Sequence, residues 1–132
     1  MKASFYIATF CLISLNIFLV YSRIISSTRS NGKTSVSIVE TNDEYMLRAY
    51  FNVNKTAKVQ EYLNKCLKPN SLFGSENDYF NANTMLTDNT ELHIRKSPGK
   101  LEIKLNKRIN SYSSYCRIKK MCDGVSDVLS GK

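Results

Sequence analysis

Alternation of apolar and polar residues in five short segments is the feature that most constrains the fold of this chain. Successive side chains of a β-strand point to opposite faces, so each segment predicts a strand with one apolar face. Turn residues at 41–43, 88–89 and 98–99 separate neighbouring segments and predict tight connections between them. The predicted strands span residues 35–40, 44–51, 79–86, 90–96 and 101–107.

Two further segments carry apolar residues at helical spacing. The first follows Asn54, an expected helix cap, and the second follows Asn110 or Ser111. Their apolar stripes are Val59, Tyr62, Leu63, Cys66 and Leu67 in the first helix, and Tyr115, Ile118, Cys122, Val125 and Leu129 in the second. The element order is therefore β-β-α-β-β-β-α. It predicts an α+β two-layer sandwich, an antiparallel sheet of about five strands with both helices on one face.

The predicted domain spans residues 35–132, about 98 residues, which is enough to bury a modest core. Its ββα and βββα halves are loosely similar, but the sequence shows no repeat of fixed period. Residues 23–34 are rich in Ser and Thr and predict a flexible tether.

The N-terminal segment predicts export or membrane attachment. Residues 3–21 are uncharged and follow Lys2, a pattern typical of a signal peptide that ends near residue 22. The same run is nearly long enough to cross a bilayer as a helix, so an uncleaved anchor is the alternative. We therefore expect a periplasmic, secreted or membrane-anchored protein, with membrane contact through residues 3–21 if they are retained.

The cysteines allow one disulfide. Removal of residues 1–22 leaves three cysteines, and two of them, Cys66 and Cys122, lie on the apolar stripes of the two helices. Our hypothesis is that Cys66 and Cys122 form a disulfide that joins the helices. The alternative is a pair of buried free thiols.

The sequence contains no recognisable catalytic, cofactor or metal site. His93 is the one histidine, and strand alternation places it on the polar face of its strand, opposite the cysteines of the helix stripes. A nucleophile–base pair needs both groups on the same side, and a zinc site needs clustered ligands. We therefore expect a protein without catalysis, cofactor or metal.

Positive charge is concentrated in one region. Residues 95–120 contain nine Lys or Arg and one acid, Glu102, for a net charge of +8, which equals that of the whole chain. Regional charge of this kind indicates a docking surface for an anionic partner, and the alternative is a solvated charged face. The expected partner-binding residues are Arg95, Lys96, Lys100, Lys104, Lys107, Arg108, Arg117 and Lys120.

These features predict a small non-enzymatic binding or accessory module. For an exported protein we expect an acidic protein, an anionic lipid or a glycan as the partner, rather than nucleic acid. A protein inhibitor or immunity-type protein is the first alternative, and a small hydrolase is the second.

Overall fold

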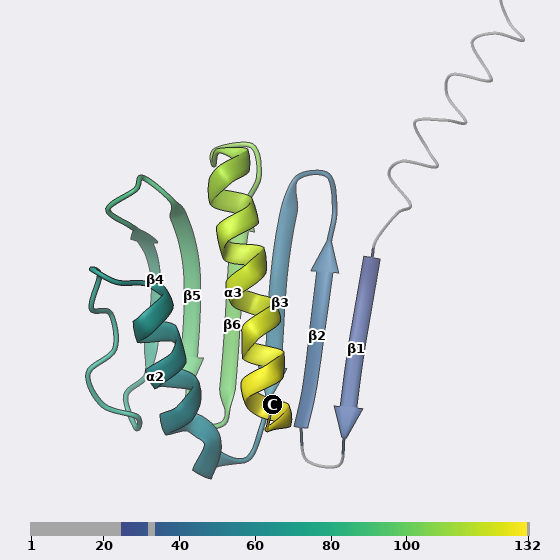
Figure 1. Ribbon diagram of the computed structural model, residues 1–132, viewed down its shortest axis with the longest axis vertical. Helices are drawn as coiled ribbons and strands as arrows, with labels where there is room; N and C mark the ends of the chain where they lie inside the picture. The colour runs from purple at the N-terminus through teal and green to yellow at the C-terminus, as the bar shows by residue number, and fades with distance from the viewer. Residues whose placement is uncertain (1–24, 32–33, 132) are drawn as a thin grey trace, which may run out of the picture.

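The chain forms one antiparallel sheet covered on one face by two helices (Figure 1). The computed structural model describes residues 25–31 and 34–131. Residues 1–22, predicted to be a signal peptide or a membrane anchor, lie outside them. The strands are β1 (Ile25–Asn31), β2 (Thr34–Glu40), β3 (Glu44–Tyr50), β4 (Phe80–Met85), β5 (Glu91–Ser97) and β6 (Lys100–Asn106). The helices are the short 3-10 turn η1 (Val53–Lys55), α2 (Thr56–Cys66) and α3 (Tyr112–Ser130).

The α+β class and the order of the predicted elements are confirmed, with one strand added. All five predicted strands and both helices are present in the expected sequence. The correction concerns residues 23–34, which we expected to be a flexible tether. Residues 25–31 instead form β1, which pairs with β2 along its whole length, from Ile25 opposite Glu40 to Asn31 opposite Thr34. The described sheet therefore has six strands, in the order β1-β2-β3-β6-β5-β4.

Local sequence explains the turns and the helix starts. Gly99 has a positive φ of 74° in the β5–β6 turn, as a Pro-Gly turn requires. Ser111 caps α3, because its side chain accepts a hydrogen bond from the Ser114 amide. The expected cap at Asn54 is wrong. Asn52 caps η1 by accepting from the Asn54 amide, and α2 continues from that turn without a side-chain cap of its own.

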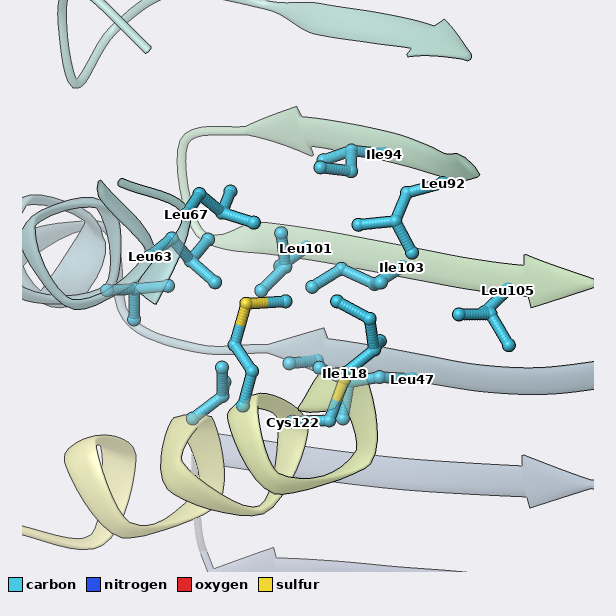
Figure 2. Close-up of a cluster of buried hydrophobic side chains, with 14 of the residues drawn as sticks. Leu47, Leu63, Leu67, Leu92, Ile94, Leu101, Ile103, Leu105, Ile118 and Cys122 are labelled. Carbon is cyan, nitrogen blue, oxygen red and sulfur yellow. The ribbon is translucent and has the colours of Figure 1, made fainter. Parts of the chain in front are cut away.

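The core lies between the helices and the inner face of the sheet (Figure 2). Leu47, Ile94 and Ile103 from three neighbouring strands are fully buried there. Leu63 of α2 and Ile118 of α3 meet them from the opposite side. Burial of each such side chain contributes about 1.5–3 kcal/mol, so the apolar face of the sheet determines where the helices pack.

The described part of the chain consists of two βββα halves whose strands are arranged symmetrically about the β3–β6 pair. Exchange of β1, β2 and β3 with β4, β5 and β6 leaves the strand order unchanged. In the first half Ile38 pairs with Leu47, and in the second Ile94 pairs with Ile103, each residue 56 positions further along. Leu47 and Ile103 face each other at the middle of the β3–β6 ladder. The sequence showed only loosely similar ββα and βββα halves, because the first strand falls in the segment expected to be a tether.

The two helices approach each other at a glycine. Tyr62 of α2 lies against α3 and donates a hydrogen bond to the carbonyl oxygen of Met121, with an O–O distance of 3.0 Å. A Cβ atom at Gly124 would lie 1.8 Å from the Tyr62 hydroxyl oxygen. The close packing of α2 on α3 therefore requires glycine at a position where helix propensity favours alanine by about 1 kcal/mol.

We expect Gly124→Ala to lower the free energy of unfolding by about 1–3 kcal/mol, because the added methyl group displaces Tyr62 and its hydrogen bond. Urea unfolding followed by circular dichroism measures the change. Ser126→Ala, two residues further along α3, is the matched control and should change stability by less than about 0.5 kcal/mol. A Gly124→Ala protein as stable as the wild type would show that the helices do not pack as described.

Candidate functional site

The face of the sheet opposite the helices is not covered by any described element (Figure 1). We call it the open face. At its centre a row of side chains crosses three strands. In the strand register, Arg48 of β3 lies opposite Glu102 of β6, and Glu102 lies opposite Arg95 of β5. In the next row Lys104 of β6 lies opposite His93 of β5. Neighbouring strands are about 4.8 Å apart, so these side chains form one continuous surface.

Glu102 organises the charges of the open face. It is 8% exposed, although it lies on the polar side of β6. Arg48 covers it with a contact of 2.9 Å between Nε and Oε2, and the Lys104 ammonium lies 3.9 Å from Oε1. Arg48 and Lys104 occupy equivalent positions in the two halves of the sheet, 56 residues apart. Glu102 therefore forms ion pairs with basic residues from both halves of the sheet.

Two further cations on this face have no ion-pair partner among the described residues. Arg95 is exposed, and Lys100 places its ammonium 5.4 Å from the centre of the Tyr50 ring. Tyr50 is itself 48% exposed. With Arg48 and Lys104 they form the basic surface, defined as Arg48, Arg95, Lys100 and Lys104, with net positive charge around a single acid.

The structure divides the eight expected partner-binding residues among different locations. Arg95, Lys100 and Lys104 lie together on the open face. Lys96 is buried on the inner face beneath the loop before β4, so it is not part of the open face. Arg117 and Lys120 belong to α3, in the helical layer. The residues close in sequence are separated because alternation along a strand sends neighbours to opposite faces.

Besides Lys104, ion pairs engage three of the eight expected residues. Lys107 donates to Glu40 Oε1 and to the Thr41 carbonyl oxygen, both at 2.8 Å. Arg108 binds Asp43 through two nitrogens, and Arg117 binds Asp88. These contacts fix the ends of strands and α3, and they reduce the charge that is available to a partner.

Arg48 is the residue that the sequence analysis missed. It lies outside the basic segment 95–120, and only the β3–β6 pairing places it beside Glu102. The alternation of residues 44–50 already assigned it to the polar face of its strand. The partner strand, however, cannot be derived from that pattern.

The described residues show no arrangement for catalysis or metal binding. His93 bonds through Nδ1 to Asn83 Oδ1 at 2.7 Å on the open face, whereas Cys122 is buried under the helices. No group of three or more His, Cys, Asp or Glu side chains in the described part of the chain converges on a metal position. We keep the absence of enzymatic activity as an expectation.

The proposed disulfide is not formed in the structure, where Cys66, Cys116 and Cys122 are all free thiols. Cys122 is fully buried and Cys66 half-buried. Burial raises the pKa of the Cys122 thiol, and the nearby Asp123 and Cys66 raise it further. Cys122 is therefore a neutral thiol packed in the core, and the bridge stays a hypothesis.

Comparison with family models, with curated proteins and with solved structures gave no match for this chain. No helix within residues 25–31 and 34–131 has the length and apolar character needed to cross a bilayer.

A cluster around Glu40 ties α3 to the sheet. The Glu40 carboxylate accepts hydrogen bonds from Lys107 and from the Tyr115 hydroxyl, and Lys119 lies 3.9 Å away. Burial by itself would raise the Glu40 pKa, but the bonds from Lys107 and Tyr115 and the charges of Lys107 and Lys119 outweigh it. The pKa is therefore lowered from its ordinary value of 4.5.

Because the folded protein lowers the pKa of Glu40, its contribution to stability is complete above pH 4.5 and is lost as the pH falls through the lower, folded-state pKa. We expect Glu40→Gln to lower the free energy of unfolding by about 1–2 kcal/mol at pH 7, because it removes a charged acceptor. The loss should shrink as the pH falls below 4.5. Urea unfolding of both proteins between pH 3 and pH 7 tests this, and a loss that is constant over that range would contradict it.

Proposed function

We propose that this protein is a small non-enzymatic binding module whose basic surface, Arg48, Arg95, Lys100 and Lys104, docks an acidic patch of a partner protein. The main observation in its support is that the helices cover only one face of the sheet. The helices occupy the inner face, and the open face presents four cations from three adjacent strands around one buried acid. A flat, preformed sheet face binds without the entropy cost of ordering a loop.

The distribution of positive and negative charge on the open face favours a protein partner over a lipid surface or a polyanionic glycan. One end of the face carries Glu44 of β3 and Glu91 of β5, on the same side of the sheet as the basic surface. A uniformly anionic membrane or glycan would be repelled at that end. A protein partner can instead place acidic groups opposite the cations and basic or neutral groups opposite Glu44 and Glu91, which gives both attraction and orientation.

The location of the protein is part of the proposal. The uncharged run at residues 3–21 after Lys2 supports export or attachment to a membrane. We therefore infer a partner in the cell envelope or outside the cell. An inhibitor or immunity-type role remains compatible with this surface, since it would use the same docking chemistry on an acidic enzyme.

Charge reversal on the two layers of the sandwich tests the proposal. Arg95→Glu with Lys100→Glu inverts two cations of the open face. Lys58→Glu with Lys120→Glu makes the same change in net charge at exposed positions of α2 and α3. Each double variant and the wild type are used to capture proteins from envelope extracts, and the captured partner is then purified for titration calorimetry.

We expect the open-face variant to weaken partner affinity at least tenfold, about 1.4 kcal/mol, and the helix-layer variant to leave it within twofold. Raising the salt concentration should weaken wild-type binding, because exposed charges are screened. Equal losses in the two variants would exclude the open face. Tighter binding to phosphatidylserine vesicles or heparin than to any protein would replace the protein partner with a lipid or a glycan.

A further inference from the structure

A small pocket lies beneath the loop that connects α2 to β4. It has a volume of about 210 Å³. Its wall is mixed in polarity, and the aromatic part includes Phe73 and Phe80, whose rings meet edge to face at 5.3 Å between centroids. The lining residues are Leu72, Phe73, Gly74, Ser75, Asp78, Tyr79, Phe80 and Lys96.

Lys96 is the cation of this pocket. It continues the inward-facing series of β5 after Leu92 and Ile94 and is 3% exposed. Its ammonium donates to the carbonyl oxygens of Ser75, Glu76 and Asp78 at 3.3, 3.3 and 3.4 Å. Hydrogen bonds from N–H groups to oxygen span about 2.7–3.2 Å in proteins, so all three bonds are long.

No carboxylate of a described residue forms a salt bridge with Lys96 within 4.0 Å. Asp78 uses its Oδ2 atom to accept from the Ser75 amide at 3.0 Å. Burial lowers the pKa of Lys96, and the more distant charges of Asp78 and Glu76 only partly oppose that effect. The ammonium also lies 5.7 Å from the centre of the Phe73 ring, a cation–π contact. The positive charge still has no ion-pair partner among the described residues, a costly condition for a buried ammonium.

We propose that this pocket binds a small organic monocarboxylate, whose carboxylate pairs with the Lys96 ammonium while its apolar body packs against Phe73 and Phe80. The pocket size suits such a ligand, since a cavity of about 150 Å³ in another protein accommodates benzene. A carboxylate supplies the missing counter-charge and a short, charge-assisted hydrogen bond. Inorganic phosphate lacks the apolar body that the aromatic wall would cover.

Benzoate and benzamide provide a matched pair of probes, because they share a ring and differ in charge. We expect titration calorimetry of the full chain at pH 7 to give at least tenfold tighter binding of benzoate than of benzamide. Amide chemical shifts should change in residues 72–80 and at Lys96. Equal affinity of the two probes, no benzoate binding, or shifts confined to other regions would overturn the proposal.

Two variants assign the binding to the pocket. Lys96→Met keeps the length of the side chain without its charge and should weaken benzoate binding at least tenfold, whereas Lys68→Met, at an exposed lysine just after α2, should not. If Lys96→Met does not fold, Leu72→Trp serves as the second test of the site. Leu72 is half-buried and lines the pocket, so a larger side chain there fills it. Unchanged benzoate affinity in a folded Lys96→Met or Leu72→Trp protein would refute the site.

Discussion

The central ladder between β3 and β6 is the interaction on which the rest of the structure depends. It joins the two βββα halves into one sheet, with Leu47 opposite Ile103 at its midpoint. Both residues are fully buried, so the ladder needs cover from the helices on its inner face. α2 and α3 supply that cover together, and the close contact of Tyr62 with Gly124 sets how near they lie. Neither half alone would bury the apolar faces of its strands as completely.

The same ladder creates the candidate docking surface. Because every residue that faces inward on β3 and β6 is apolar, the alternate residues are free to carry charge on the other side. The pairing brings Arg48 of one half and Lys104 of the other onto Glu102. The burial of the core and the concentration of charge on the open face are therefore two consequences of one register, and a shift by one residue would destroy both.

Buried charge outside the open face has a different role. The Glu40 cluster is compensated within the fold, since Lys107, Lys119 and the Tyr115 hydroxyl surround the carboxylate. Lys96 has no ion-pair partner within 4.0 Å among the described residues, and its ammonium is held by three long bonds to carbonyl oxygens and a contact with the Phe73 ring at 5.7 Å. The Glu40 cluster therefore stabilises the attachment of α3 to the sheet. Lys96 is instead a buried cation with a pocket beside it.

The sequence by itself determined the type of each element in residues 35–129 and the residues that form the core, because strand and helix periodicity are local properties. It also indicated that Arg95 and Lys104 carry charge on the polar sides of their strands. Only the tertiary structure decided that β1 extends the sheet, that Arg48 joins the basic surface, and that Lys96 is buried under a loop. Those outcomes depend on which strands pair and which loops fold over them, and contacts between residues distant in sequence leave no periodic signal in the chain.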